Sequence, residues 1–266
     1  MTSLDRRCVL RAATSAAAAG ALAAGCAPHR DEGSGTVRTT GGPSPSGAAR
    51  RPPAPARAAR PPTRVPGLPV QIEHGPRGRR AVALTFHGAG DPKLATALLG
   101  EAERAGAHVT VLAVGAWLDA QPAMARRILD GGHELGNHTM HHRAVCALPA
   151  AEAYAEIRRC ADRLRRLTGT IGSWFRPSRT RRATDLVVRL AGEAGYPHVL
   201  SYDVDSLDAT DPGAPAVQRT VLDAVRPGSV VSLHLGHAGT VAALPPILDG
   251  LRRRGLRAVT TTELVT

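Results

Sequence analysis

Short apolar runs alternate with amphipathic helical patterns from residue 81 to the C-terminus, and this alternation limits the folds that the chain can adopt. Residues 81–86 read Ala-Val-Ala-Leu-Thr-Phe, a continuous apolar run typical of a strand buried on both faces. Asp91 and Pro92 then suit the N-cap and first turn of a helix that ends at Gly106. Further strands are expected over 108–114, 134–137, 173–175, 198–205, 230–234 and 256–259, and further helices over 122–130, 149–168, 184–194, 214–225 and 241–253. The pattern predicts an α/β domain with a parallel sheet, either open or rolled into a barrel.

Polar side chains recur just after the predicted strands, at the end of the sheet where barrel enzymes place their active sites. They are His87, Asp91, His138, His142, Arg176, Asp203, Asp205 and His234. Side chains with no common role would be spread over both ends of the strands. Their recurrence at one end therefore predicts a functional site.

His138 and His142 lie four residues apart, directly after the predicted strand 134–137. At this spacing the two imidazoles can meet on one side of the backbone. Two neutral nitrogen ligands, with a third ligand from elsewhere in the chain, suit a divalent metal such as Zn²⁺. The alternative interpretation is a surface loop that is rich in histidine and binds no metal.

The formal net charge of +12 comes mostly from arginine, since Lys93 is the only lysine. Such a balance can indicate nucleic-acid binding, but we find no nucleic-acid motif, and only 3% of the residues are aromatic and able to stack on bases. Much of the excess charge lies in the first 70 residues. We therefore expect no nucleic-acid partner and consider anionic polymers of the cell envelope as neighbours.

Residues 1–26 have the form of an export signal. Arg6 and Arg7 precede an apolar run over 12–24, as in a twin-arginine signal, and the run is too short and too weakly apolar to span a membrane. It ends in Leu-Ala-Ala-Gly-Cys, which resembles a lipoprotein processing site with Cys26 as the lipidated residue. We expect an exported protein anchored to the cell membrane through Cys26 and facing the cell wall, or a secreted protein if ordinary signal peptidase cleaves nearby.

Residues 27–70 are dominated by Gly, Ser, Pro, Ala and Arg and lack an apolar period, so we expect a disordered linker there. The remaining residues, 71–266, are enough for one domain with a full core. Cys146 and Cys160 are the only cysteines in this domain. In an exported chain such a pair can form a disulfide, which we favour over two free thiols.

Four segments, in this order, resemble motifs of the polysaccharide deacetylases of the chitin-deacetylase and NodB-homology type. Residues 132–139 together with His142 resemble the family's metal motif, His-Ser/Thr-x-x-x-His. Residues 175–177 resemble its arginine motif, 203–208 its acidic motif, and 228–234 its final strand with the catalytic histidine. The resemblance extends over nearly all of the predicted domain and implies a distorted (β/α) barrel.

The first motif departs from the family pattern. The family carries Thr-Phe-Asp-Asp-Gly-Pro, in which the first Asp is the general base and the second binds the metal. Here Thr-Phe is followed by His87 at the position of the base and by Gly88 at the position of the metal carboxylate. Either Asp91 supplies the third ligand from a differently shaped loop, or His87 coordinates the metal and Asp91 acts as the base. Arg179 and Ala209 also replace an aromatic residue and a tryptophan expected in the later motifs.

The resemblance implies a metal-dependent hydrolase that removes N- or O-acetyl groups from a cell-wall or extracellular polysaccharide, either peptidoglycan or a chitin-like glycan. The expected metal ligands are His138, His142 and Asp91. In the implied mechanism Asp91 or His87 takes the proton of water, and His234, oriented by Asp205, protonates the leaving group. Arg176 is expected to pair with an acidic group of the site.

The altered first motif supports a second hypothesis. In it, the chain is a catalytically impaired envelope lipoprotein that keeps the same fold and binds glycan. The presence of His234 argues against it, because a binding protein has no need of a general acid.

Overall fold

The computed structural model describes residues 58–266. The expected export signal over 1–26, the lipidation of Cys26 and most of the expected linker lie outside the described residues.

A parallel sheet forms the centre of the domain, and its middle strand is β2 (Ala81–Gly88). Its neighbours are β3 (Thr110–Ala113) and β7 (Val230–His234), followed at the edges by β4 (Glu134–Asn137) and β6 (Val204–Asp205). The first residues of β2 also pair with β8 (Arg257–Val259). Because all these pairs are parallel, the carboxyl ends of β2, β4 and β7 lie at the same end of the sheet.

β1 (Gln71–Ile72) and β5 (Val199–Leu200) form a second, two-stranded parallel sheet. Phe175 links the two sheets, since it forms single bridges with Asn137 of β4 and with Val199 of β5. The expected strand over 173–175 is thus reduced to these bridges, and the expected strand over 198–205 is divided into β5 and β6. The prediction of an α/β domain with a parallel sheet is confirmed, although hydrogen bonds do not close the strands into a ring within residues 58–266.

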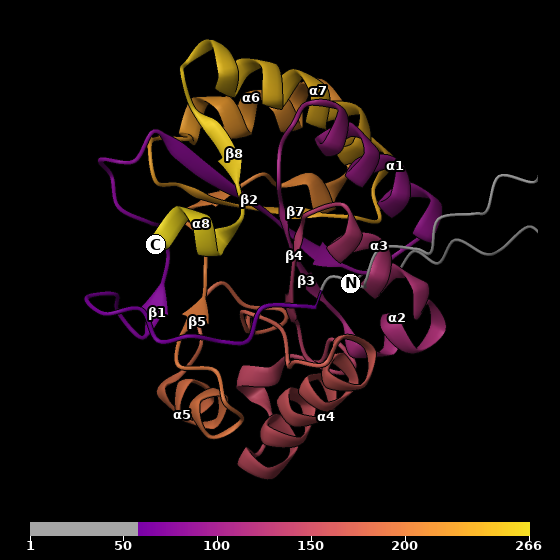
Figure 1. The fold of residues 1–266 in the computed structure, drawn as a ribbon, viewed down its shortest axis with the longest axis vertical. Coiled ribbons are helices and arrows are strands. Elements are labelled where there is room, and N and C mark those ends of the chain that lie inside the picture. Colours follow the sequence, from indigo (N-terminus) through magenta and orange to yellow (C-terminus); the bar gives the residue numbers. More distant parts are fainter. Residues whose placement is uncertain (1–57) are drawn as a thin grey trace, which may run out of the picture. The chain divides into compact units, whose positions relative to one another are not determined.

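Helices cover the outside of the strands. In Figure 1, α1 (Pro92–Arg104), α6 (Ala214–Ala224) and α7 (Ala238–Arg253) lie on one side, and α4 (Ala150–Thr168) and α5 (Asp185–Glu193) lie on the other. The short α2 (Gly115–Ala120) and α3 (Ala123–Asp130) connect β3 to β4. The single turns η1 (Val145–Ala147) and η2 (Asp208–Thr210) and the terminal α8 (Thr261–Val265) complete the described chain. None of these helices combines the length and the apolarity required to cross a lipid bilayer.

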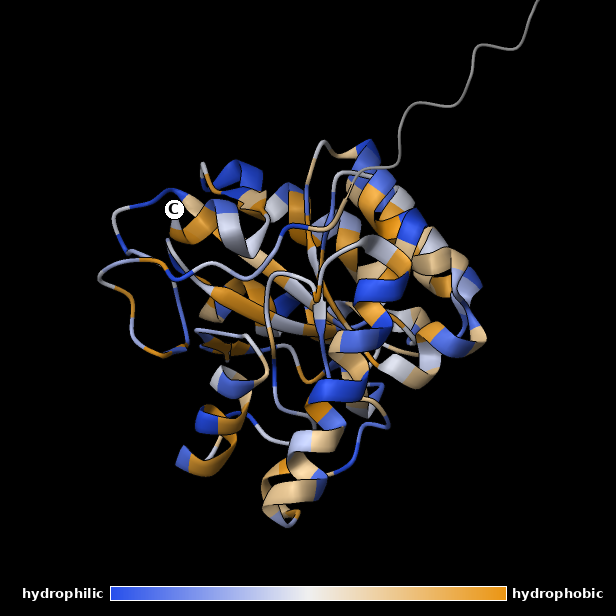
Figure 2. Cartoon of the chain, turned by 60° about the horizontal axis from the view of Figure 1, so that its bottom comes forward, coloured by the Kyte–Doolittle hydropathy of each residue, from blue (hydrophilic) through white to orange (hydrophobic). Residues whose placement is uncertain are grey.

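The core lies between the strands and the inner faces of the helices. The central strands are apolar, whereas polar residues lie along the outer faces of the helices (Figure 2). In α1, Leu98 and Leu99 are fully buried against the sheet, and each such side chain contributes about 1.5–3 kcal/mol to folding. Asp91 caps the N-terminus of this helix by accepting a hydrogen bond from the Lys93 amide at 2.8 Å.

The packed domain begins earlier than Gln71, where the sequence composition placed its start. Ala59 is buried, and its carbonyl accepts a hydrogen bond from the Thr170 hydroxyl at 3.2 Å. Further along, the Val65 amide donates to His198 Nε2 at 2.9 Å. Residues 58–70 therefore follow the surface of the domain, because their backbone groups find partners that composition alone does not reveal.

The expected disulfide between Cys146 and Cys160 is not formed, and both thiols are free. Cys160 is buried on the inner face of α4, where its thiol lies 3.5 Å from the Ala113 carbonyl. Cys146 instead lies near the carbonyl of Arg182. Burial raises the pKa of the Cys160 thiol to about 12, which keeps it in the protonated and unreactive form.

His133 is a structural residue at the opposite end of the strands from the predicted site. It is buried, and its Nδ1 accepts a hydrogen bond from the Val109 amide at 3.2 Å. Burial lowers the pKa of His133 to about 4, although the nearby Glu103 carboxylate acts in the opposite direction.

We expect this histidine to make the domain less stable in acid. Since the unfolded chain takes up a proton near pH 6.5 and the folded one does not, stability should fall as the pH drops from about 6.5 towards 4, by at most roughly 3 kcal/mol from this residue. His133→Asn keeps an acceptor for Val109 but cannot be protonated, so its stability should fall less. Urea unfolding at about pH 7 and about pH 4.5 measures the difference. The same loss of stability in both proteins would contradict the prediction.

Candidate metal centre and active site

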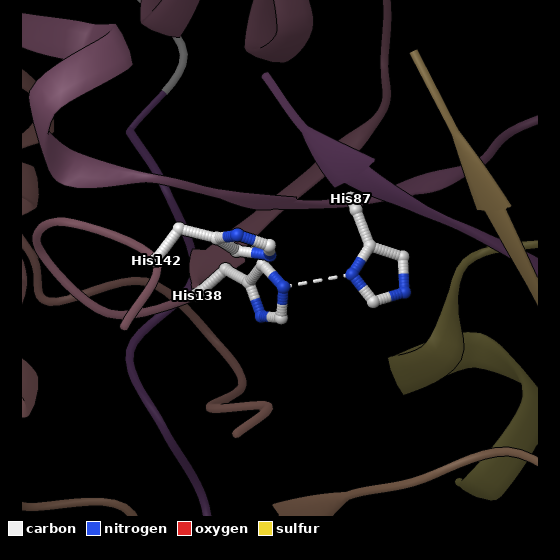
Figure 3. Close-up of side chains that lie close together, drawn as sticks. All are labelled: His87, His138 and His142. Atoms are coloured by element: carbon white, nitrogen blue, oxygen red, sulfur yellow. Dashed lines mark hydrogen bonds between the residues drawn. The ribbon is translucent and has the colours of Figure 1, made fainter. Parts of the chain in front are cut away.

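Three histidines meet at the carboxyl end of the sheet. His87 lies near the end of β2, His138 follows β4 directly, and His142 lies in the next loop. One ring nitrogen from each lies within 4.8 Å of the other two (Figure 3). The sequence pair His138 and His142 is thus brought together, and its third partner is His87.

The loop that carries His138 and His142 is tightly turned. Thr139 and His142 both have backbone φ angles in the left-handed region, at 67° and 55°. The Asn137 side chain stabilises the turn by accepting a hydrogen bond from the Thr139 amide at 2.8 Å. At its far end, Arg179 Nε donates to the His142 carbonyl at 3.0 Å. These contacts hold both imidazoles towards β2.

The ring nitrogens of the histidines have defined partners. His87 Nδ1 lies 2.7 Å from His138 Nε2, as the dashed line in Figure 3 shows. On its other side, His87 Nε2 lies 2.9 Å from the Ser232 hydroxyl. His138 Nδ1 donates to the carbonyl of Arg176 at 3.0 Å. With the proton on Nδ1, the lone pair of His138 lies on Nε2, which faces His87.

These three histidines are suited to hold a divalent metal. Burial lowers the pKa of His87 and His138 well below the ordinary value, and neighbouring positive charge lowers it further. Burial and then Arg179 also lower the pKa of His142. The rings are therefore neutral near pH 7, the form that binds metal, and three imidazoles are a known ligand set for catalytic zinc. The carbonyl partner of His138 is also typical of metal-binding histidines.

A histidine–aspartate pair lies beside the three histidines. His234, at the end of β7, stacks on His87 with ring centroids 4.3 Å apart. Its Nδ1 donates to the carboxylate of Asp208 at 2.7 Å, and its backbone amide donates to the same carboxylate at 2.8 Å. Thr240 donates to it as well, at 2.6 Å. Burial alone would raise the pKa of Asp208, but the hydrogen bonds from His234 and Thr240 outweigh it, so the pKa is lowered and the group is ionised.

The partner of His234 is therefore Asp208 and not Asp205, which the sequence had suggested. Asp205 is exposed and accepts hydrogen bonds from the Leu207 amide and, at 3.4 Å, from the Tyr202 hydroxyl. The backbone turns back at Leu207, whose φ is 58°, and this turn places Asp208 beneath His234. Nothing in the spacing of the acidic residues indicates which one reaches the histidine.

Two other predicted residues have different surroundings from those expected. Asp91 serves as the exposed N-cap of α1 and is not part of the group of three histidines. Arg176 is fully buried, and it donates to the carbonyls of Leu200 and Ser201 at 3.2 and 2.9 Å. Its Nη1 has no partner among the described residues. Burial lowers the pKa of Arg176 to about 9, which still leaves it charged at pH 7.

A cleft of about 410 Å³ opens over this arrangement. Its lining combines three histidines with polar, charged and apolar side chains: His87, His142, Arg179, Thr180, Arg181, Tyr202, Asp205, Leu207, Ala209, Thr210, Ser232 and His234. Sequence reasoning did not identify Ser232, Tyr202 or Asp208 in these surroundings. Ser232 precedes His234 by two residues on one strand and so shares its face of the sheet, which is the signal that could have revealed it.

Known proteins resemble this chain in sequence. A family model described as polysaccharide deacetylase matches residues 74–199. The peptidoglycan-N-acetylglucosamine deacetylase of Bacillus cereus is 31% identical over 202 residues, which cover 71% of this chain and 90% of that protein. The chain belongs to the polysaccharide deacetylase family. Members of this family are hydrolases that act on carbon–nitrogen bonds other than peptide bonds.

Other members of the deacetylase family extend the comparison. The chitooligosaccharide deacetylase of Bradyrhizobium sp. is 28% identical over 215 residues, or 72% of this chain and 94% of that protein. The solved structure of a peptidoglycan N-acetylglucosamine deacetylase superposes with a TM-score of 0.70 at 26% identity, over 74% of this chain and 92% of that one. A CE4 family pseudoenzyme from Bacillus anthracis shares the fold, with a TM-score of 0.71 at 23% identity over 75% and 70% of the two chains.

Gly88 shows that this deacetylase site is built differently from the Thr-Phe-Asp-Asp pattern. A Cβ atom at residue 88 would lie 2.8 Å from Ala113 Cα and 2.8 Å from Val111 Cγ1, so a side chain does not fit without movement of the neighbouring strand. The backbone therefore leaves no room for a carboxylate side chain at residue 88.

Proposed function

We propose that the chain is a metal-dependent hydrolase that removes acetyl groups from a cell-wall polysaccharide. One observation carries the proposal: three neutral imidazoles converge beside the His234–Asp208 pair at the base of an open cleft. The relatives named as deacetylases of peptidoglycan and chitooligosaccharides support it. The export signal and the lipid anchor at Cys26, which would place the domain at the cell envelope, belong to the same proposal.

The chain's own residues account for binding and for proton transfer. A divalent cation held by the three imidazoles, Zn²⁺ in the first instance, would lower the pKa of water and polarise the acetyl carbonyl. As water adds to the acetyl carbonyl, His234 takes its proton and then passes that proton to the leaving nitrogen or alkoxide, so that the bond to the carbonyl carbon breaks and acetate departs. Asp208 fixes the ring of His234 and stabilises its protonated form.

The cationic wall of the cleft favours an anionic glycan. Arg179 and Arg181 both line the cleft, together with the carboxylate of Asp205. Arg181 lies 3.7 Å from the Glu73 carboxylate, whereas Arg179 is exposed and forms no ion pair with a carboxylate within residues 58–266. Peptidoglycan carries free carboxylates on its peptides, whereas a chitin oligomer is neutral. We therefore favour peptidoglycan as the substrate class over a chitin-like glycan.

Arg179→Gln tests this preference. Because exposed ion pairs contribute about 0.2–1 kcal/mol, we expect KM for peptidoglycan fragments to rise by up to about fivefold and KM for chitin oligomers to stay unchanged. Loss of the Arg179 hydrogen bond to the His142 carbonyl should instead lower kcat for both glycans alike. Arg166→Gln, which changes an exposed arginine of α4 that does not line the cleft, is the matched control. An equal rise in KM for both glycans would contradict a role for Arg179 in recognising charge.

The function itself is tested by measuring metal content and acetate release on the same preparation of the full chain. The expected result is a bound divalent metal together with release of acetate from acetylated peptidoglycan or chitin oligomers, which a chelator abolishes and Zn²⁺ restores. Acetate release that persists in metal-free protein would refute the metal mechanism.

A second candidate function rests on the first motif, in which His87 and Gly88 stand where the family has two carboxylates. On this interpretation the chain is a catalytically impaired glycan-binding lipoprotein; a protein of the same fold from Bacillus anthracis is described as a CE4 family pseudoenzyme. Bound metal and glycan without acetate from any acetylated glycan would favour this candidate over the hydrolase.

A further inference from the structure

A continuous chain of hydrogen bonds fixes the protons on two of the three histidines. It runs from the Ser232 hydroxyl to His87, from His87 to His138, and from His138 to the carbonyl of Arg176, over distances of 2.9, 2.7 and 3.0 Å. The last group is a carbonyl, which can only accept. His138 therefore carries its proton on Nδ1 and presents the lone pair of Nε2 to His87.

The proton position on His138 fixes the remaining protons in this series of hydrogen bonds. His87 must donate from Nδ1 to His138 Nε2, so the lone pair of His87 lies on Nε2. The Ser232 hydroxyl then donates to that lone pair. In this state the Nδ1 atom of His87, which faces His138 in Figure 3, carries a proton and has no lone pair to offer a cation.

A cation held by the three imidazoles requires the opposite arrangement at His87. One proton must leave Nδ1 and one must be taken up at Nε2, so that the ring stays neutral. The new Nε2–H then needs an acceptor in a place where water is largely excluded, since Ser232 is 2% exposed. A hydroxyl can meet this need by rotating, because it accepts as readily as it donates.

We infer that Ser232 is a positioning residue of the metal centre, whose hydroxyl donates to His87 in the metal-free protein and accepts from it in the metal-bound protein. This inference rests on the proposed function. Ser232 lies on β7 beside β2, where the parallel register pairs it with Thr85, two residues before His87. Its hydroxyl forms no other hydrogen bond within residues 58–266, so nothing competes with His87 for it.

The test is the affinity of Ser232→Ala for Zn²⁺, measured by competition with a chromophoric chelator. Loss of an outer partner of a metal-binding histidine typically weakens metal affinity about 10- to 100-fold, and we expect a loss in this range. Thr85→Val is the matched control, because it removes a buried hydroxyl of β2 that donates to the Val231 carbonyl and has no hydrogen bond with a histidine among the described residues. This control should bind Zn²⁺ as the wild type does.

Nitrogen NMR of the imidazoles gives a readout that a merely structural role would not change. In the metal-free wild type, His87 should carry its proton on Nδ1, and Zn²⁺ should shift it to Nε2. Ser232→Ala that binds Zn²⁺ as tightly as the wild type, or a His87 proton already on Nε2 without metal, would overturn the inference and leave the proposed function intact. A wild type that binds no metal would overturn both.

Discussion

Replacing His138 by alanine should abolish metal binding and reduce acetate release by at least about 100-fold, since even the loss of an outer partner of a metal ligand costs 10- to 100-fold. His138 is the fully buried member of the group of three, and it contacts both His87 and the carbonyl of Arg176. Its removal therefore takes away one ligand and the residue that orients another. Metal content by mass spectrometry and acetate release on acetylated peptidoglycan fragments measure the two losses.

The same substitution leaves a cavity and two polar groups without partners, so a loss of folding has to be separated from a loss of metal. His142→Ala serves this purpose because His142 lies partly exposed in its loop. It should keep the thermal stability of the metal-free protein and still lose metal and activity. His108→Ala, in an exposed histidine away from the cleft, is the control. Full activity in both His138→Ala and His142→Ala would show that the three imidazoles are not a catalytic metal centre.

The second large effect is expected for Asp208→Asn, which should lower kcat about 10²- to 10⁴-fold, the range that positioned acid–base groups contribute. The new side chain can still accept hydrogen bonds from the His234 amide and from Thr240. Its amide nitrogen would then face His234 Nδ1 in place of the carboxylate oxygen, so the protonated form of His234 loses its stabilising charge. Metal content should remain at the wild-type level.

Asp205→Asn is the matched comparison, because Asp205 lines the same cleft but is exposed and is not bonded to His234. We expect its kcat to fall by less than about tenfold, as for other exposed charges. Steady-state kinetics of the two variants on one acetylated substrate show which carboxylate supports His234. A larger loss for Asp205→Asn than for Asp208→Asn would contradict the pairing of Asp208 with His234.

The fold was predictable where long apolar runs set the secondary structure. β2 contains the predicted strand 81–86, and the bounds of β7 agree with the predicted strand 230–234. Short elements were not predictable in this way, because β1 has two residues and α2 has only six, too few to show a period. Their formation depends on pairing and packing with distant segments, such as that of Gln71 with Val199.

The site was predictable in its histidines and less so in its carboxylates. His87, His138 and His234 were identified because each follows a buried strand. Asp91 and Asp205 also follow strands, but a carboxylate at such a position has several competing uses. Asp91 follows the ordinary preference of aspartate before proline and caps a helix, and the turn at Leu207 decides which acidic residue meets His234. A turn of this kind cannot be predicted from the spacing of the acidic residues along the sequence.

The first described residues bear on how the domain would be presented at a cell surface. Ala58 and Arg60 lie with His108 and His133, near the amino ends of β3 and β4, whereas the cleft opens at the carboxyl ends of the strands. An anchor joined ahead of residue 58 would thus attach at the end of the domain that lies opposite the cleft. Such an enzyme would work facing outward, on glycan strands beyond it, and the lipid bilayer behind it would not obstruct their approach.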